Sequence, residues 1–468
     1  MKHLQIKKEE NDMKIIILGS GQVGLSIASD LIDENHDITL VSDDNQVLME
    51  VSEKLDLRTV CGHGSFPEVL REAGAESADM LLAVTDSDEV NMVACQVAYS
   101  LFNIDKKIAR IRSQHYLIRD ELFGSDNLPI DIFISPEQLV TRFIEQLIAH
   151  PGALKVMNLG DGTIKLVGVK VFYGGLCVGK TLAEINSIVP DGVFNVAVVF
   201  RGDDMAPQDE TLTIEVGDEV YFICHESQSH AILAAFRRIE APNHRIMIAG
   251  GGGVGACLAE ALQHNYGVKV VDRDLQRCEF IAERMKVTVL HGDACDRDLL
   301  RNENIDSVDV FCSVTDDDED NMIAALQAKR LGVKQVMALI TRTAYVDIIH
   351  DTSINVAISP QQITVGSILP HLRRGDVRYV YELRHGQTDV IECKVHGDKK
   401  TSRLVGKSLG DVSWPNSVSV AAVIRSNKLV STDDNYEIQA GDHLVLVLGD
   451  VRRLKELEKL FQVSADFF

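Results

Sequence analysis

Lys14-Ile15-Ile16-Ile17-Leu18, followed at once by Gly19-Ser20-Gly21-Gln22-Val23-Gly24, is the stretch that decides the fold. An apolar strand that runs into Gly-x-Gly-x-x-Gly and then into a helical pattern is typical of the first β-α turn of a dinucleotide-binding domain. In that turn the first glycine makes the bend, the second lets the backbone approach a pyrophosphate, and the third lets helix and strand pack closely. The phosphates then lie at the amino end of the helix.

The same stretch occurs a second time, 250 − 19 = 231 positions later, as Arg245-Ile246-Met247-Ile248-Ala249 followed by Gly250-Gly251-Gly252-Gly253-Val254-Gly255. Further matches follow in the same order: Thr85-Asp86 through Asn91-Met92 matches Thr315-Asp316 through Asn321-Met322. Because order and spacing persist, we interpret the chain as two copies of one unit.

A smaller unit follows each copy, since Gly179-Lys180-Thr181-Leu182 and Gly217-Asp218 correspond to Gly406-Lys407-Ser408-Leu409 and Gly441-Asp442. The predicted fold class is α/β, with two Rossmann-like, doubly wound parallel-sheet domains, each followed by a small α+β domain. Turn residues cluster at His150–Gly152, Ala241–Asn243 and Arg374-Gly375, which indicates junctions there. The expected domains are therefore residues 13–145, 150–238, 244–368 and 374–462.

Length and composition agree with several packed domains. The 468 residues are 45% hydrophobic and 25% charged, and the formal net charge of −23 makes nucleic acid an unfavourable partner. The nine cysteines have no metal-ligand spacing, which is typical of reduced thiols in the cytosol. No apolar run reaches the roughly 18–20 residues of a membrane span. Residues 1–12, which precede Met13, are too charged for a signal peptide and are expected to lie outside the fold.

The acidic residue that follows the second strand is the usual anchor for the adenosine ribose. In the second copy this is Asp272, which ends the run Val268–Val271 at 272 − 250 = 22 residues after the first glycine. Its carboxylate favours NAD or ATP/ADP over NADP. In the first copy Ser42 stands at this place, followed by Asp43 and Asp44, so the anchor there is shifted or weakened.

Thr85-Asp86 and Thr315-Asp316 each follow an apolar strand and precede a helix, at the edge of the sheet where ligands of open α/β sheets lie. Two interpretations remain open for them, direct ligand contact or helix capping. Arg110 and Arg112 end the predicted strand Ile108–Ile111, and we expect Arg110 to contact a phosphate.

The sequence supplies binding groups without a catalytic set. Gly174–Thr181 fits a phosphate-binding loop literally, but the small domain's second copy has Thr401 in place of the first glycine. Hydride transfer would need a placed acid or base, and the small domains share none. We therefore expect a binding protein and not an enzyme. The alternatives are an NAD-dependent oxidoreductase with an unidentified substrate and a redox-sensing DNA-binding repressor, although no helix-turn-helix pattern is visible.

The first glycine loop with Met13, together with Gly62-His63-Gly64-Ser65 and Asn91–Asn103, resembles the Trk potassium-uptake protein A family over residues 13–468. The resemblance implies two RCK N-terminal domains, each followed by an RCK C-terminal domain. It implies a regulatory subunit, cytoplasmic and peripheral on the inner face of the membrane, which binds NAD(H) or ATP/ADP. It also implies a homo-oligomeric ring, expected as a tetramer, that controls a membrane potassium translocator of the TrkH/TrkG type.

The resemblance also implies ligand positions, and Ser42 departs from the family's aspartate there, which puts the NAD affinity of the first site in doubt. Together with the motifs above, the expected cofactor-binding residues come from both copies, and no metal site is expected. They are Gly19, Ser20, Gly21, Gln22, Val23, Gly24, Ser42, Asp43, Thr85, Asp86, Arg110, Gly250, Gly251, Gly252, Gly253, Val254, Gly255, Asp272, Thr315 and Asp316.

Overall fold

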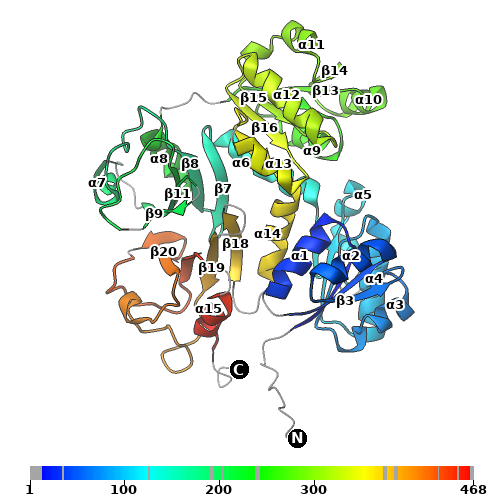
Figure 1. Ribbon diagram of the computed structural model, residues 1–468, viewed down its shortest axis with the longest axis vertical. Coiled ribbons are helices and arrows are strands. Elements are labelled where there is room, and N and C mark those ends of the chain that lie inside the picture. Colours follow the sequence, from blue (N-terminus) through cyan, green and yellow to red (C-terminus); the bar gives the residue numbers. More distant parts are fainter. Residues whose placement is uncertain are drawn as a thin grey trace, which may run out of the picture. The chain divides into compact units, whose positions relative to one another are not determined.

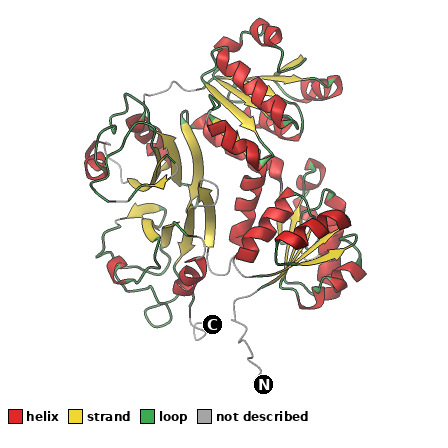
Figure 2. Ribbon diagram, viewed as in Figure 1, coloured by secondary structure: helices red, strands yellow, loops and turns green. Residues whose placement is uncertain are grey.

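The structure is a computed structural model, shown in Figures 1 and 2. It describes residues 13–33, 36–124, 127–188, 194–202, 204–207, 209–237, 243–350, 352–372, 377–383, 388–430, 432–450 and 453–463. The chain divides into two compact units, one up to Pro136 with Ile363–Leu369, the other Glu137–Gln362 with Pro370–Phe468. Residues 1–12 and the predicted junctions at 241–242 and 374–375 lie outside the described residues. No helix in the described ranges is both long and apolar enough to cross a membrane.

The first unit contains a six-stranded parallel sheet in the order β3-β2-β1-β4-β5-β6. This is the strand order of a dinucleotide-binding fold. Its strands are β1 (Lys14–Leu18), β2 (Asp37–Ser42), β3 (Arg58–Cys61), β4 (Met80–Ala83), β5 (Lys106–Arg110) and β6 (Ile132–Ile134). The helices between them are α1 (Gln22–Asp33), α2 (Asn45–Lys54), α3 (Pro67–Glu72), η1 (Ala75–Ser77), α4 (Asp88–Phe102), α5 (Gln114–Leu117) and η2 (Asp120–Leu122).

The central strand β1 shows why an apolar run becomes part of this sheet. Ile15 to Leu18 are at most 2% exposed, because helices cover both faces of a parallel sheet and leave no solvent side for polar residues. Leu18 pairs with Val41 on one side and with Ala83 on the other. The carboxyl ends of β1, β2 and β4 are therefore aligned at one edge of the sheet, and the residues that follow these strands meet there.

The second Rossmann-like sheet repeats this arrangement in the order β14-β13-β12-β15-β16-β17. Its strands are β12 (Arg245–Ala249), β13 (Gly267–Asp272), β14 (Thr288–His291), β15 (Val310–Ser313), β16 (Gln335–Leu339) and β17 (Val356–Ile358). Its helices are α9 (Gly253–Leu262), α10 (Leu275–Arg284), α11 (Arg297–Asn302), η4 (Ile305–Ser307), α12 (Asp318–Arg330) and α13 (Thr343–His350).

The helix that follows each parallel sheet belongs, at least in part, to the other compact unit. Helix α6 (Pro136–Ala149) belongs, from Glu137 onward, to the second unit. The middle of α14 (Pro360–Leu372), Ile363–Leu369, belongs to the first unit.

Each small domain is built on a five-stranded antiparallel sheet, in the orders β10-β9-β11-β8-β7 and β18-β19-β22-β20-β21. The first has β7 (Ala153–Leu159), β8 (Ile164–Lys170), α7 (Leu182–Ile188), β9 (Phe194–Arg201), β10 (Asp204–Met205), β11 (Glu219–His225), η3 (Glu226–Gln228) and α8 (Ser229–Phe236). The second has β18 (Val377–Leu383), β19 (Thr388–Lys394), η5 (Leu409–Asp411), β20 (Val418–Arg425), β21 (Lys428–Val430), β22 (His443–Leu448) and α15 (Leu454–Phe461).

The two small domains share one hydrophobic core, which joins residues such as Phe200 and Tyr221 of the first sheet to Val390 and Val445 of the second. Buried polar contacts cross the same interface: Gly160 N donates to Glu392 Oε2 at 2.7 Å. Each small sheet therefore covers the apolar face that the other would otherwise expose to water.

The predicted fold class is confirmed: two Rossmann-like parallel sheets are each followed by an antiparallel sheet. One feature was not part of the sequence prediction. The shared core of the small domains was not foreseen, because an apolar face does not indicate which partner covers it.

Candidate functional site

The first glycine loop joins β1 to α1, and its three glycines play different roles. Gly19 has φ +110°, and a Cβ there would lie 2.9 Å from the Val84 carbonyl oxygen. A Cβ on Gly24 would overlap the Gly19 carbonyl oxygen. Gly21 has no atom within 4 Å of the place where its Cβ would be. The first and third glycines are therefore required by the protein's own packing, while the second faces open space.

The second loop repeats this pattern between β12 and α9. Gly250 has φ +103°, and a Cβ on Gly255 would overlap the Gly250 carbonyl oxygen. Gly252 caps α9, and the nearest atom to its hypothetical Cβ is Arg277 Nη1, at 3.7 Å. Because that atom ends a flexible side chain, the second glycine is also accessible here. Gln22 and Val23 open α1 in the first copy, as Gly253 and Val254 open α9 in the second.

The residues at the expected ribose anchor buttress the glycine loops. Asp272, at 8% exposure, accepts the Gly251 N–H at 2.5 Å through Oδ2 and the Asp274 N–H at 2.7 Å through Oδ1. In the first copy the Ser42 hydroxyl lies 2.8 Å from the Ser20 hydroxyl. Both side chains thus hold the loop at the same place, but only Asp272 brings a charge to it.

The two acidic residues after Ser42 differ in their contacts. Asp44 is the N-cap of α2, where Oδ1 accepts the N–H groups of Gln46 and Val47 at 2.9 and 3.2 Å. Asp43 is exposed. If a carboxylate substitutes for the missing anchor in the first copy, Asp43 is the better candidate.

Arg110 reaches the same edge of the first sheet. Its Nη2 lies 2.7 Å from Asp86 Oδ1, and Arg112 Nη2 lies 2.9 Å from the same oxygen. Arg110 is 8% exposed, and its buried Nε has no hydrogen-bond partner within the described residues. A buried guanidinium with an unpaired donor is an unusual and costly arrangement, which a bound anion would relieve.

The threonine-aspartate pairs are not helix caps, so that interpretation is wrong. Ser87 caps α4 by accepting the Val90 N–H, and Asp317 caps α12 by accepting the Asp320 N–H. Thr85 instead donates its hydroxyl to Asn91 Oδ1 at 2.7 Å, and Thr315 donates to Asn321 at 2.8 Å.

The sequence reasoning assigned no role to two buried asparagines that organise this edge. Asn91 Nδ2 donates to the Thr85 and Arg110 carbonyls, at 3.2 and 2.9 Å, and so links the ends of β4 and β5. Asn321 makes the corresponding bonds to Thr315 and Leu339. The available signal in the sequence was that an asparagine occurs at the same position of each copy, as Asn91 and Asn321.

Two buried carboxylates complete the same network. Asp88 accepts the Arg112 and Ser113 N–H groups, and Asp318 accepts those of Thr341 and Arg342. Each carboxylate therefore ties the start of a helix to the segment after the next strand.

The two copies differ in where they place positive charge. Leu339 occupies the position of Arg110, as the matching asparagine bonds show. In the second copy the nearest cation in sequence to the anchor is Arg273, which pairs with Asp293 and Asp320 at 2.8 Å each. Hydrogen bonding to Asp293 raises the pKa of Arg273. The first copy thus has a buried arginine at the end of β5. The second copy has no arginine at that position, but it has a carboxylate anchor at the end of β13 with an exposed arginine beside it.

The segment Gly174–Thr181, which matches the sequence pattern of a phosphate-binding loop, has contacts that belong to the small domain itself. Thr181 and Glu184 form a reciprocal cap at the start of α7, with Thr181 N donating to Glu184 Oε2 at 3.0 Å and Glu184 N donating to Thr181 Oγ1 at 3.3 Å. A Cβ on Gly175 would overlap the Phe236 carbonyl oxygen. These groups serve the packing of the small domain.

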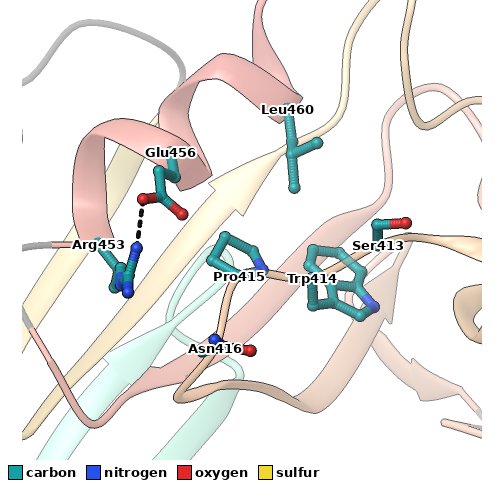
Figure 3. A pocket seen from close by; sticks show the side chains of 7 residues that line it. All are labelled: Ser413, Trp414, Pro415, Asn416, Arg453, Glu456 and Leu460. Atoms are coloured by element: carbon teal, nitrogen blue, oxygen red, sulfur yellow. Dashed lines mark hydrogen bonds and ion pairs between the residues drawn. The ribbon is translucent and has the colours of Figure 1, made fainter.

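Cavities also lie outside the glycine loops. One of about 350 Å³ lies in the second small domain, where Trp414 and Pro415 stand opposite Leu460 and the Arg453–Glu456 ion pair of α15 (Figure 3). Another, of about 500 Å³, lies in the second Rossmann-like domain.

The fold and the paired glycine loops define a class of tandem proteins in which a Rossmann-type domain and a small antiparallel domain alternate. The TrkA-N domain family matches residues 15–136 and 246–360, and the TrkA-C domain family matches residues 166–237 and 399–462. The chain belongs to the family of the Trk system potassium uptake protein TrkA. It is 46% identical to the proteins of that name from Halomonas elongata and Vibrio alginolyticus, over 97% of this chain and 100% of each relative.

Solved structures share the fold. The GsuK RCK domain aligns with a TM-score of 0.61 at 17% identity, over 97% of this chain and 96% of that chain. The GsuK channel bound to NAD aligns with the same TM-score and identity, over 97% of this chain and 79% of that chain.

Proposed function

We propose that this chain is a non-catalytic regulatory subunit of a Trk-type potassium uptake system. It binds NAD(H) or ATP/ADP in its Rossmann-like domains and thereby controls potassium transport by the membrane translocator. The observation that carries the proposal is the difference among the glycines of each loop: the first and third are required by packing, whereas Gly21 and Gly252 leave the loop backbone open to a ligand.

Phosphate binding is supported by the groups around each loop. Helices α1 and α9 begin directly after Gly21 and Gly252, and the amino end of a helix offers backbone N–H groups to an anion. In the first copy Arg110 adds a buried guanidinium whose Nε has no partner among the described residues. A phosphate there could also draw Arg110 or Arg112 away from Asp86, which both arginines share.

Ribose binding is best supported in the second copy. Asp272 uses one lone pair of each carboxylate oxygen for the Gly251 and Asp274 N–H groups. A carboxylate has about four acceptor sites, so it can still accept hydrogen bonds from ribose hydroxyls. The first copy offers only the Ser42 hydroxyl at this place, and we propose that the two sites differ in ligand preference.

A regulatory and non-catalytic role agrees with the chemistry of the clefts. Two carboxylates that follow β4 in the first copy are occupied, Asp86 by two arginines and Asp88 by backbone N–H groups. Within the described residues there is no group of three or more His, Cys, Asp or Glu side chains that could hold a metal ion. The groups that remain available are suited to binding.

Similar proteins support the proposed partner and ligands. The relatives are named as Trk system potassium uptake proteins, so the proposed partner is a TrkH/TrkG-type translocator, with this chain peripheral on its cytoplasmic side. The neighbouring structures of GsuK bound to NAD and to ADP support the two ligand classes. We propose a homo-oligomeric ring, expected as a tetramer, in which a nucleotide with different affinities for two ring geometries shifts their populations.

The test uses two matched variants, Gly21→Val and Gly252→Val. Each fills the open space of one loop, and each leaves the other copy intact as its control. We expect equilibrium binding of NADH and ATP to fall from two sites per chain to one in each variant. In vesicles that contain the translocator, nucleotide should change potassium flux in the wild type and to a smaller extent in at least one variant. Two unchanged sites in both variants, or a flux that ignores nucleotide, would contradict the proposal.

A further inference from the structure

The cavity of about 500 Å³ lies at the edge of the second Rossmann-like sheet opposite to its glycine loop. We call it the basic pocket and define it by Arg245, Tyr266, Gly267, Lys269, Lys286 and Ser307, which are among the residues that line it. Arg245 and Gly267 begin β12 and β13, Lys286 shortly precedes β14, and Ser307 shortly precedes β15. The pocket is therefore formed at the amino ends of four parallel strands, whereas the nucleotide cleft lies at the carboxyl ends.

The basic pocket concentrates positive charge in a chain whose formal net charge is −23. Three of its lining residues are cationic, Arg245, Lys269 and Lys286, and none of the lining residues is acidic. Lys269 is partly neutralised, because its Nζ lies 2.8 Å from Glu303 Oε2. Arg245 and Lys286 are exposed, and within the described residues neither side chain forms an ion pair. Two uncompensated cations and one partly compensated cation thus face a common space.

Asp309, which directly follows the lining residue Val308 in the sequence, is already occupied. Asp309 Oδ2 accepts the backbone N–H groups of His244 and Arg245 at 2.9 and 3.0 Å, and Oδ1 pairs with Lys334 Nζ at 3.4 Å. Hydroxyl groups complete the site. A tyrosine hydroxyl is protonated at neutral pH and can donate a hydrogen bond, and burial and the charge of Glu145 both raise the pKa of Tyr266.

The first copy shows that this charge is not required by the fold. Asp37 stands there in place of Gly267, as the registers Lys14↔Asp37 and Arg245↔Gly267 show. By the spacing to β3 and β14, Asp56 corresponds to Lys286, since 58 − 56 and 288 − 286 are both 2.

The remaining positions complete the comparison. Thr39 corresponds to Lys269, as the registers Thr39↔Arg58 and Lys269↔Thr288 show. The first copy therefore combines Lys14 and Arg58 with two carboxylates, so the formal charge of these positions is zero. The corresponding residues of the second copy carry a formal charge of +3. Because both copies have the same strand order, folding alone does not explain the difference.

We propose that the basic pocket binds a soluble anion that carries two or more phosphate groups, independently of the nucleotide clefts. Its volume of about 500 Å³ lies within the roughly 300–1,000 Å³ typical of small-molecule sites. Clustered Arg and Lys side chains are suited to phosphate, which accepts charge-assisted hydrogen bonds from several donors at once. A concave site of this size favours a small soluble ligand over a lipid headgroup held in a membrane plane.

The test titrates inorganic pyrophosphate into the full chain in saturating NADH, which keeps the glycine loops filled. Two variants introduce the residues of the first copy, Lys286→Asp and Gly267→Asp. The second should be well tolerated, because no atom lies closer than 3.6 Å to a Cβ on Gly267 and the nearest side-chain atom is Arg245 Cγ at 3.9 Å. We expect one pyrophosphate per wild-type chain by calorimetry and an affinity lower by at least about tenfold in each variant. Lys400→Asp, which makes the same charge change at an exposed site elsewhere, should bind like the wild type.

The outcomes separate the sources of phosphate. No pyrophosphate binding by the wild type, or an equal loss in Lys400→Asp, would overturn the proposal. Co-sedimentation with phosphatidylglycerol vesicles that depends on Lys286, without binding of soluble pyrophosphate, would assign the pocket to a lipid headgroup and overturn it as well. Since NADH binding is recorded in the same samples, failure of the basic pocket and failure of the nucleotide clefts are distinguishable.

Discussion

Alanine substitutions at two glycines of the first loop should have different effects. Gly24→Ala should lower the stability of the domain, whereas Gly21→Ala should weaken nucleotide binding without lowering stability. In Gly24→Ala the new Cβ would overlap the Gly19 carbonyl oxygen and lie 3.4 Å from a methyl group of Val84, so the loop must shift. Overpacking of this kind costs about 1–3 kcal/mol. In Gly21→Ala the new Cβ meets no atom within 4 Å, and the φ of Gly21 is not in the left-handed region. We expect this variant to keep its stability, or to gain about 0.4–1 kcal/mol from a less flexible unfolded chain.

The assay must report on the first Rossmann-like domain alone. The single tryptophan, Trp414, lies in the second small domain, so its fluorescence is unsuitable. Native-state hydrogen exchange of the β1 amides reports the local opening free energy directly. A loss of about 1–3 kcal/mol corresponds to exchange that is roughly 5- to 150-fold faster in Gly24→Ala. Gly21→Ala should exchange like the wild type and bind NADH less tightly at the first site.

The matched pair in the second loop, Gly255→Ala and Gly252→Ala, should behave in the same way at β12. Wild-type exchange rates in Gly24→Ala, or faster exchange in Gly21→Ala than in Gly24→Ala, would refute this prediction. A Gly21→Ala variant that keeps both its stability and its full NADH affinity would leave the folding argument intact and contradict the ligand position.

Three further predictions concern other residues. Ser42 and its partner Ser20 stand where the second copy has an aspartate and a glycine. The double variant Ser20→Gly/Ser42→Asp should therefore bind NAD at least about tenfold more tightly at the first site, as expected for one added charge-assisted hydrogen bond. Equilibrium titration measures this affinity. Burial lowers the pKa of His150, so below about pH 6.5 the unfolded chain takes up a proton that the folded chain does not, and stability falls as the pH falls. Urea unfolding at pH 7.5 and 5.5 should therefore show a smaller loss in His150→Phe than in the wild type. Iodoacetamide should label exposed Cys61 well before buried Cys95, since burial raises the pKa of the Cys95 thiol to about 12; peptide mass spectrometry checks the order.

Much of the candidate site could be predicted because it is local in sequence. The bend at Gly19, the helix that follows it and the acid at Asp272 depend on residues within one β-α-β unit. Glycine spacing and apolar runs encode such units directly. The duplication supplies an internal comparison, which distinguishes Ser42 from Asp272 within the sequence alone.

Other parts of the site depend on residues that meet only in the folded chain. Asn91 was visible as a repeated residue, but its bond to the Arg110 carbonyl depends on β4 and β5 being neighbours. Whether Thr85-Asp86 caps a helix or belongs to the cleft could not be decided from residue type, since serine, threonine and aspartate are all good caps. The structure assigns the cap to Ser87.

By itself, then, the sequence determined the two glycine loops, the repeated order of domains and the family, because each is encoded in contiguous residues. Only the tertiary structure decided that Arg110 and Arg112 share Asp86, that the two small domains bury one core, and that Arg245 and Lys286 face one cavity. Those contacts join residues that are distant in the chain. They depend on strand order and on which apolar face covers another, and neither is encoded in a local pattern.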